Sequence, residues 1–340
     1  MVTCDPTFCV VIPFYQKDEA PLVLAVQSVL NQRGVPTPQI LIVDDGSPCP
    51  ALPILYRHFA NPEDFIRVIY QPNGGAAKAR NTALNNLPQA TRYVAFLDSD
   101  DEWATDHLSN AKKALDAGCD FYFANYKRLD WPQTRFEQMG PVFSYREALI
   151  PEAGIYRYSD NHVLPVLGYQ MVKTSTVVYL RERLAAIRFR ENLVLGEDDV
   201  FWLEAFQHAA KIGVCLNVGV QMGEGVNISQ GSEWGGDRSF HLMSLNMVKW
   251  KLLPGIFNDS PEVLALTKVR KAELRRMFIA GLLHRLRRGC FIPMEAMIRF
   301  TRADKTWFFS IPSETADMFV EAIRSILKKI PKNHKPREKT

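Results

Sequence analysis

The sequence predicts an α/β fold, with a mostly parallel sheet flanked by helices and a helical extension at the C-terminus. Three observations support this prediction. Short apolar segments alternate with longer segments whose apolar residues recur at helical spacing. The short segments are continuously apolar, as expected for strands covered on both faces. Acidic and turn residues follow these segments, at the sheet edge where such folds bind ligands.

The first part of the chain shows this alternation most clearly. Residues 8–13 (FCVVIP) predict a buried strand, and 19–32 carry apolar residues at helical spacing. Residues 39–48 (QILIVDDGSP) and 65–75 (FIRVIYQPNGG) are apolar runs ending in acids or glycines, so each predicts a strand and its turn. The paired glycines lead into a predicted helix over 76–87. Helices between strands are the usual crossovers of a parallel sheet.

The pattern continues and then weakens. Residues 92–101 (RYVAFLDSDD) predict a fourth strand that ends in acids. Residues 106–118 predict a helix that stops at a glycine, and 119–126 (CDFYFANY) predict a fifth strand. Prolines interrupt the pattern from about 130 to 165, which indicates a long irregular insertion. Residues 168–180 (GYQMVKTSTVVYL) predict a further strand.

The last third is less regular. Residues 191–209 predict a loop running into an amphipathic helix, and 211–220 predict a strand. Residues 223–239 are rich in glycine and serine and predict a loop. From residue 262 onward we expect helices, followed by a polar, basic tail.

Length and composition limit the class of protein. The chain has 340 residues, of which 47% are hydrophobic and 23% charged, and its net charge is +4. These values are ordinary for a globular protein, and the net charge does not indicate a nucleic-acid partner. The six scattered cysteines form no metal-binding spacing, as expected of reduced thiols in the cytosol. The N-terminus lacks a signal-peptide pattern and no apolar run is long enough to span a membrane, so we expect a cytoplasmic protein.

The acids of the segment LDSDD, Asp98, Asp100 and Asp101, pose a chemical question. Carboxylates clustered at one strand end repel each other and need a counter-charge. Without neighbouring Cys or His, they favour a hard ion, Mg²⁺ or Mn²⁺, whose remaining ligands are commonly phosphate oxygens and water. The segment therefore indicates a metal–diphosphate site. A solvated acidic turn that caps the next helix is the alternative.

Five motifs occur together in the first three fifths of the chain, in the order VVIPFYQKDE, ILIVDDGSP, QPNGGAAKARNTAL, YVAFLDSDDEW and LGEDDVFW. In combination they resemble the family 2 glycosyltransferases over about residues 8–210. The resemblance implies the GT-A fold, a Rossmann-like sheet, and an inverting enzyme that uses a nucleotide-sugar donor. It also implies a catalytic domain over 1–225, with a nucleotide-sugar half at 1–128 and an acceptor half at 129–225, then a helical region at 226–330 and a basic tail at 331–340.

The resemblance also assigns roles to individual residues. It implies that the donor nucleotide is contacted by Pro13, Phe14 and Tyr15, by Asp45 or its neighbour Asp44, by Asn73 and by Arg80. A simple turn is the alternative for the aspartates, and a helix entry is the alternative for Asn73.

The acids of the last two motifs would carry the chemistry. Asp98 would approach the ribose and Asp100 would bind Mg²⁺ or Mn²⁺, with Asp101 as a less certain third member. Asp198 would be the catalytic base, although Asp199 follows it directly and either could serve. A carboxylate that takes the proton of an acceptor hydroxyl during attack is a common form of general base catalysis. Capping of the following helix by Glu197 and Asp198 is the alternative.

The C-terminal third departs from the processive members of the family. The segment QGSEW at 230–234 resembles their QxxRW motif, but Glu233 replaces the arginine, so we expect a non-processive enzyme. Basic residues interleaved with leucines over 262–290 indicate an amphipathic helix that binds an anionic membrane surface, or one that packs on the catalytic domain and leaves a solvated basic face. No nucleic-acid partner is expected, since no recognition motif accompanies the charge.

The expected function is transfer of a sugar, with UDP as the commonest nucleotide, to a hydroxyl of a glycan or lipid-linked acceptor in surface polysaccharide or lipopolysaccharide synthesis. The enzyme would work in the cytoplasm, at the inner face of the membrane. A nucleotidyltransferase is one alternative, but the glycine-rich signature expected near its first strand is missing. A non-catalytic relative is another, against which the intact acidic motifs argue.

Overall fold

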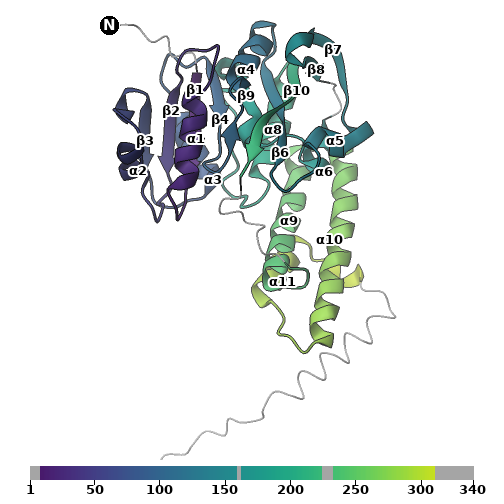
Figure 1. The fold of residues 1–340 in the computed structure, drawn as a ribbon. Coiled ribbons are helices and arrows are strands. Elements are labelled where there is room, and N and C mark those ends of the chain that lie inside the picture. Colours follow the sequence, from purple (N-terminus) through teal and green to yellow (C-terminus); the bar gives the residue numbers. More distant parts are fainter. Residues whose placement is uncertain (1–7, 159–161, 224–232, 311–340) are drawn as a thin grey trace, which may run out of the picture. The chain divides into compact units, whose positions relative to one another are not determined.

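The computed structural model describes residues 8–158, 162–223 and 233–310. By their internal packing the residues divide into two compact units, Met1–Asn227 and Ile228–Thr340 (Figure 1). The first unit is built around one sheet, and the second is helical.

The sheet of the first unit has ten strands among the described residues. They are β1 (Phe8–Phe14), β2 (Gln39–Asp44), β3 (Ile66–Tyr70), β4 (Tyr93–Phe96), β5 (Glu102–Trp103), β6 (Phe121–Arg128), β7 (Tyr145–Ile150), β8 (Ile155–Tyr158), β9 (Val177–Leu180) and β10 (Ile212–Met222). Their order is β3-β2-β1-β4-β9-β6-β10-β8-β7, and β5 pairs with β10.

Strand direction divides this sheet into two regions. Strands β3, β2, β1 and β4 run parallel, as the sequence predicts. Strand β9 then lies antiparallel between β4 and β6, although β6 and β10 are parallel to each other. The α/β prediction is confirmed, and the sheet as a whole is mixed because, among the neighbours beyond β4, β6 and β10 pair parallel and the other pairs are antiparallel.

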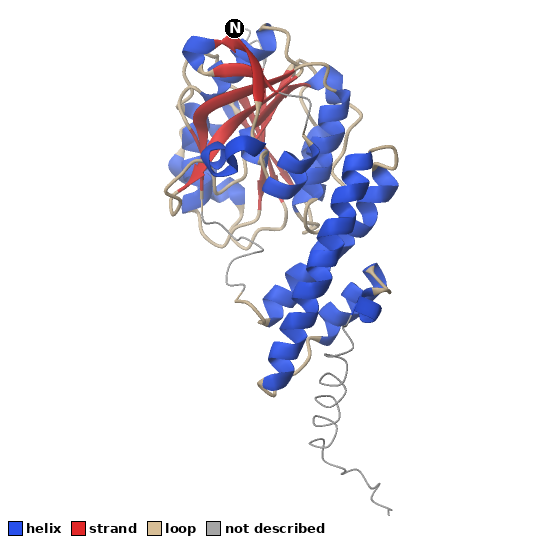
Figure 2. Ribbon diagram, turned by 90° about the vertical axis from the view of Figure 1, so that its right-hand side faces the viewer, coloured by secondary structure: helices blue, strands red, loops and turns tan. Residues whose placement is uncertain are grey.

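Helices cover both sides of the sheet (Figure 2). They are α1 (Ala20–Leu30), α2 (Ala51–His58), α3 (Ala76–Asn85), α4 (His107–Asp116), α5 (Arg135–Met139), α6 (Val163–Tyr169), α7 (Arg181–Leu184) and α8 (Glu197–His208), with short 3-10 turns at η1 (Pro62–Asp64), η2 (Gly140–Val142), η3 (Pro151–Ala153) and η4 (Thr174–Thr176). Because both faces are covered, the central strands are buried almost throughout. In β1, every residue is buried except Pro13, which is half-buried.

Two predictions for the middle of the chain are wrong. The segment 130–165 is not irregular, since it contains α5 and the β7–β8 hairpin. Its prolines mark element boundaries, with Pro141 and Pro151 opening 3-10 turns and Pro165 in the first turn of α6. A proline is tolerated in the first turn because its missing N–H has no helical partner there.

The strand predicted at 168–180 is also mostly wrong. Helix α6 extends to Tyr169, Gln170 ends it in the left-handed conformation at φ 49°, and η4 follows. Only Val177–Leu180 is strand. Tertiary contacts override local propensity here, because the hydroxyl-bearing residues of η4 are buried against the acidic loop described below.

The second unit packs α9 (Asp237–Ile256), α10 (Pro261–Arg287), α11 (Met294–Ala303) and η5 (Trp307–Ser310) around an apolar core. The core includes Phe240, Phe278, Phe300 and Trp307, with the rings of Phe278 and Phe300 stacked 4.0 Å apart. The helical prediction is confirmed. The loop predicted at 223–239 is wrong from Asp237, where α9 begins, and its residues 224–232 lie outside the described part of the chain.

Candidate active site

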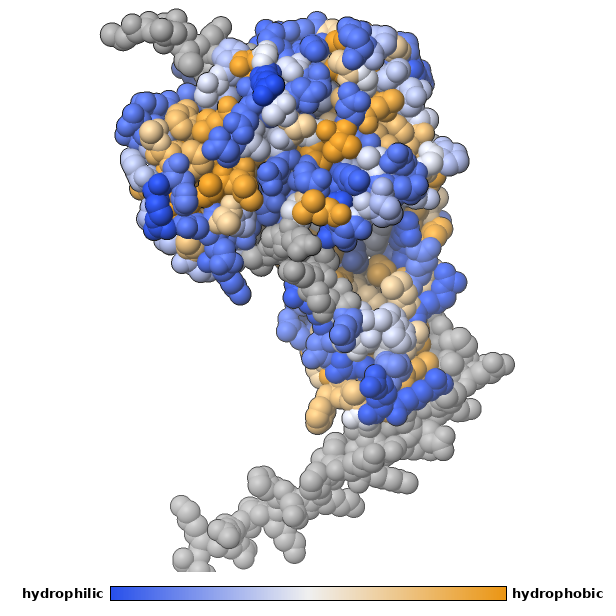
Figure 3. Space-filling model, viewed as in Figure 1, coloured by the Kyte–Doolittle hydropathy of each residue, from blue (hydrophilic) through white to orange (hydrophobic). Residues whose placement is uncertain are grey.

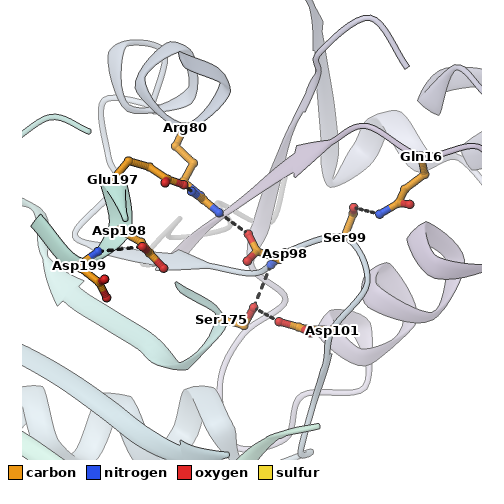
Figure 4. Close-up of polar contacts among 9 residues, drawn as sticks. All are labelled: Gln16, Arg80, Asp98, Ser99, Asp101, Ser175, Glu197, Asp198 and Asp199. Atoms are coloured by element: carbon orange, nitrogen blue, oxygen red, sulfur yellow. Dashed lines mark hydrogen bonds and ion pairs between the residues drawn. The ribbon is translucent and has the colours of Figure 1, made fainter. Parts of the chain in front are cut away.

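The acidic loop between β4 and β5 holds Asp98 and Asp101 in different environments (Figure 4). Asp98 is partly exposed and accepts a hydrogen bond of 2.7 Å from Arg80 Nη2. Asp100 is also partly exposed. Asp101 is buried, and its carboxylate accepts from the hydroxyl of Ser175 and, at 2.9 Å, from the backbone N–H of Gly223. The loop thus keeps one acid inside the protein and presents two nearer its surface.

Burial has a large effect on Asp101. Desolvation, with smaller contributions from the nearby charges of Asp100 and Asp98, raises the pKa of this carboxyl well above its usual range. Asp101 therefore keeps its proton to a higher pH than a free carboxyl does, unless a cation binds nearby. This behaviour is expected of a carboxyl in an acidic loop that binds a cation.

Ser175 fixes this loop, and sequence reasoning missed it. Its hydroxyl accepts from the backbone N–H of Asp98 at 3.0 Å and donates to Asp101. Its carbonyl accepts from the indole N–H of Trp103 at 2.7 Å, just beyond the loop. The only signal in the sequence was the hydroxyl-rich run KTST, which was attributed to a strand.

Arg80 joins the acidic loop to a second group of acids. It lies in the middle of α3, and its Nη2 donates to Asp98 while its Nη1 donates to Glu197 at 3.1 Å. Phe189 lies beneath the guanidinium, 5.2 Å from its centre. Burial alone would lower the pKa of Arg80. The negative charges of Asp98 and then Glu197 have a larger combined effect, so the pKa is raised overall and the guanidinium stays protonated. A contact between Arg80 and a nucleotide stays a prediction.

The second group of acids forms the first turn of α8. Gly196 precedes it in the left-handed conformation, at φ 81°, which lets the chain turn sharply into the helix. Burial, and then the charge of Asp198, raise the pKa of Glu197 to about 7 even though Arg80 opposes the shift. Asp198 is partly exposed, whereas Asp199 is 3% exposed, so the two candidates for the base differ in their access to a substrate.

Lys173 is the second cation near these acids, and sequence reasoning missed it as well. It precedes η4, and its Nζ donates to the side chain of Gln170 at 3.1 Å. Burial acts to lower its pKa, but Tyr126, then Asp198 and Asp199, raise it overall. Its charge therefore lies within electrostatic reach of the predicted base.

The aspartates after β2 are engaged with the backbone around them. Asp44 is 3% exposed and accepts from the N–H groups of Ser47 and Ala51, at 2.8 and 2.9 Å, so it holds the turn that starts α2. This is the local role that sequence reasoning kept as the alternative for Asp44, and a contact with the nucleotide remains a prediction.

Asp45 holds the glycine loop that leads into α3. Its Oδ1 accepts from Gln71 Nε2 at 2.6 Å and from Gly74 N at 2.9 Å, and its Oδ2 accepts from Gly75 N at 2.7 Å. Gly75 has φ 88°, a conformation that other residues rarely adopt. One lone pair of Oδ2 is left by these bonds, so the predicted contact with a ribose or base is compatible with this role.

The remaining predicted donor contacts lie at the ends of β1 and β3. Pro13 is half-buried in β1, Tyr15 is 42% exposed just after it, and Asn73 is exposed. Gln16, which sequence reasoning passed over, donates from its side chain to Ser99 at 3.1 Å and so connects this segment to the acidic loop (Figure 4).

The donor set fits a hard divalent cation. Six acids, Asp98, Asp100, Asp101, Glu197, Asp198 and Asp199, share this region with two cations, Arg80 and Lys173. Oxygen ligands without Cys or His suit Mg²⁺ or Mn²⁺, which often use only one or two protein carboxylates beside substrate phosphates. Within residues 8–158, 162–223 and 233–310, no three His, Cys, Asp or Glu side chains converge as a ready metal cage.

Comparison with known proteins identifies the family. The model of the glycosyl transferase family 2 matches residues 9–168. The succinoglycan biosynthesis protein ExoW of Rhizobium meliloti is 30% identical over 311 residues, covering 87% of this chain and 93% of that protein. The chain belongs to the family 2 glycosyltransferases. The glycosyltransferase is also 34% identical, over 154 residues, to the putative teichuronic acid biosynthesis glycosyltransferase TuaG of Bacillus subtilis, of which it covers 59%.

Solved structures confirm the fold of this family 2 glycosyltransferase. TarS residues 1–349 of S. aureus, in complex with UDP, align over 96% of this chain and 81% of their own, with a TM-score of 0.52 and 19% identity. The mannosyltransferase PcManGT of Pyrobaculum calidifontis, with GDP-Man and Mn²⁺, aligns over 97% and 89%, with a TM-score of 0.53 and 15% identity. At these identities the comparison establishes the GT-A-type fold alone.

Proposed function

We propose that this glycosyltransferase moves a sugar from a nucleoside diphosphate sugar to a hydroxyl of a glycan or lipid-linked acceptor, with inversion at the anomeric carbon. The observation that carries the proposal is the bridge formed by Arg80, which holds the acidic loop at Asp98 and the α8 acids at Glu197. A donor diphosphate and an acceptor hydroxyl must meet within a few ångströms, and this bridge joins the two groups of acids that would receive them.

Asp198 acts as the general base in this proposal. It is the partly exposed acid beside Glu197, and its Oδ1 accepts from the N–H of Asp199 at 2.8 Å, which orients the carboxylate. Its other oxygen can take the proton of the acceptor hydroxyl as that oxygen attacks. Such a base contributes roughly 10²–10⁴-fold to the rate. A single displacement on one face of the sugar inverts the anomeric centre.

The leaving diphosphate needs positive charge as it departs. Asp100, with Asp98 and Asp101 beside it, would hold Mg²⁺ or Mn²⁺, and the ion would act as a Lewis acid toward the leaving phosphate. The protein's own part is to fix the loop. Ser175 holds it at Asp98 and Asp101, and Arg80 forms an ion pair with Asp98.

The names of the relatives support a place in the synthesis of surface polysaccharides. ExoW is named for succinoglycan and TuaG for teichuronic acid, and UDP, UDP-GlcNAc and GDP-Man are bound in the solved neighbours. We infer a UDP-sugar as the first donor to test. A lipid-linked acceptor would bring the enzyme to an anionic membrane surface at the cytoplasmic side.

The test is thermal stabilisation by a panel of nucleotide sugars, with and without Mn²⁺, on the wild type and on Asp100→Ala. A ligand at about 100 times its Kd stabilises the folded state by about 2.7 kcal/mol. We expect one nucleotide sugar to raise the melting temperature only with metal, and Asp100→Ala to lose that rise. Nucleotide binding without sugar transfer to any acceptor would instead indicate a non-catalytic relative, and no binding at all would refute the proposal.

A further inference from the structure

The second unit uses the apolar residues of α10 internally. Phe278, Leu282 and Leu286 are buried in the core formed with α9 and α11. Gly281 shows how tightly the helices meet, since a Cβ there would lie 2.8 Å from the ring of Phe240. The apolar face of this basic helix therefore packs within its own unit, and Arg275 and Arg285 are held in ion pairs with Asp304 and Asp237.

The next segment leaves its apolar residues outside. Phe291 is 91% exposed, and Met294 and Ile298 of α11 are 55% and 46% exposed. Met294 and Ile298 are four residues apart, so they share the face of α11 opposite to Ala296 and Phe300, which are buried in the core. Phe291 precedes this face, and Arg302 continues it one turn after Ile298.

Two more exposed aromatic residues follow α11 in the sequence. The indole N–H of Trp307 donates to Thr301 Oγ1 at 3.0 Å and ties η5 to the end of α11, while the Trp307 ring is buried beside Phe278 and Phe300. Phe308 and Phe309 follow in η5 and are 58% and 87% exposed. We call the set Phe291, Met294, Ile298, Phe308 and Phe309 the α11 patch. An exposed apolar group of this kind marks an interaction surface.

The charged residues around the α11 patch indicate what kind of partner it binds. Its neighbouring acids are already paired, Asp237 with Arg285, Glu295 with Arg299 and Asp304 with Arg275. The exposed basic residues Arg287, Arg288, Arg302 and Lys305 have no acidic partner in the part of the chain that the structure describes. Unpaired arginines that border exposed aromatic residues are complementary to a surface that is anionic outside and apolar beneath.

We propose that the α11 patch and its bordering arginines dock the enzyme on an anionic lipid bilayer. Phe291, Met294 and Ile298 enter the boundary between headgroups and acyl chains, and Arg287, Arg288 and Arg302 contact the lipid phosphates. The inference deepens the proposed use of a lipid-linked acceptor, since it assigns the membrane contact to residues outside the active site. No helix of the described residues is long and apolar enough to cross a membrane.

The experiment is co-sedimentation of the full chain with vesicles of phosphatidylcholine alone or of phosphatidylcholine mixed with the anionic lipid phosphatidylglycerol, to which basic residues are attracted. We expect binding to the anionic vesicles that weakens as salt is raised. Phe291→Ser with Ile298→Ser should weaken it by about tenfold or more. Arg287→Gln with Arg288→Gln should weaken it by about 5–25-fold, from the usual effect of each basic residue.

Matched controls distinguish binding through this patch from nonspecific binding by exposed apolar or charged residues elsewhere. Leu52→Ser with Leu129→Ser removes two apolar residues of the first unit that are 51% and 75% exposed, and Arg92→Gln with Lys113→Gln removes two exposed charges there. Both controls should bind vesicles as the wild type does. Equal weakening by the controls would overturn the proposal.

Two further outcomes would also overturn it. One is a dimer in sedimentation that Phe291→Ser with Ile298→Ser converts to a monomer, because a second copy would then cover the patch. The other is vesicle binding that persists unchanged in both α11 variants. Failure of this inference is distinguishable from failure of the proposed function, because the thermal shift with nucleotide sugar and metal needs no membrane.

Figure 3 shows the mixture of hydrophilic and apolar residues on one face of the second unit.

Discussion

The two groups of acids in the candidate active site are held in place by different means. In the loop after β4, the buried acid Asp101 is clamped by Ser175 and Gly223, while Asp98 is neutralised by Arg80. At the start of α8, the acids lie on the positive end of a helix dipole, and Glu197 shares the same arginine. Each group therefore combines one acid in a fixed ion pair with another that is left nearer to solvent.

This difference indicates a separate role for each of the two groups of acids. The β4 loop is fixed by side chains from distant parts of the sequence, and it places the partly exposed Asp100 beside a paired acid and a buried one, which suits a site completed by a cation. The α8 group is oriented by its own helix, with Glu197 also held by Arg80, and it leaves the partly exposed Asp198 near solvent, which suits a group that must exchange a proton. The predictions below test this comparison, from the largest expected effect to the smallest.

The largest effect is expected from the two candidates for the base. Asp198→Asn should lower kcat by about 10²–10⁴-fold, because it removes the proton acceptor without removing volume. Asp199 is buried, so Asp199→Asn should mainly reduce the free energy of unfolding. Steady-state kinetics and urea denaturation of both variants make the measurement. A reversed pattern, with kcat lost only in Asp199→Asn, would move the base by one residue.

Arg80→Met tests the bridge between the two groups. The buried guanidinium pairs with Asp98 and Glu197, and removing one partner of a buried ion pair typically costs about 3–5 kcal/mol of stability. Arg190→Met is the matched control, because Arg190 pairs with Glu204 of α8 while remaining 45% exposed. Exposed pairs contribute about 0–1 kcal/mol. Similar losses in both variants would show that the bridge is no more than a surface ion pair.

The sequence predicts the parallel half of the fold well. Strands β1 to β4 are continuous apolar runs with helices between them, so their type and order could be read from local pattern. The antiparallel half was harder. Strand β9 and its neighbours η4 and α6 form a short segment whose conformation depends on burial against the β4 loop, and no local pattern contains that information.

The same distinction applies to the site. The acids and Arg80 stand in motifs that could be recognised, and the structure brings Arg80, Asp98 and Glu197 into contact. Ser175 and Lys173 come from the segment taken for a strand, and serine or lysine carries no signal of a site without its partners. Residues that act by supporting others become visible only when long-range contacts are known.

Ser175→Ala should have a smaller effect than Arg80→Met. It removes the hydroxyl that donates to Asp101, and a buried group left with an unmet hydrogen bond costs about 1–3 kcal/mol. Ser109→Ala serves as the control, because Ser109 is partly exposed and its hydroxyl donates to the carbonyl of Asp106 in its own turn at 3.0 Å. If the β4 loop is clamped as described, Ser175→Ala should also weaken the stabilisation by Mn²⁺, and an unchanged metal response would refute the clamp.

The smallest effect concerns the pH dependence contributed by Glu197. Its pKa is raised from 4.5 to about 7 by burial and by Asp198, so between these values the unfolded chain loses this proton while the folded protein keeps it. The unfolded state then binds fewer protons, and stability falls as pH rises through this window and levels off above it. In Glu197→Gln the site stays neutral at every pH. The variant should therefore match the wild type near pH 4.5 and exceed it at pH 8 by about 1–2 kcal/mol, which is below the full linkage value because Arg80 loses its charged partner.

The control for this titration is Glu204→Gln, on the same helix and paired with Arg190. Urea denaturation at pH 4.5, 6 and 8, roughly spanning the window between a free and a raised carboxyl pKa, gives the comparison. A gain in the free energy of unfolding that grows with pH in Glu197→Gln, and is missing in Glu204→Gln, would show that ionised Glu197 destabilises the fold. A loss of stability at pH 8 would mean that the pair with Arg80 outweighs burial, and the two groups of acids would then be held in the same way.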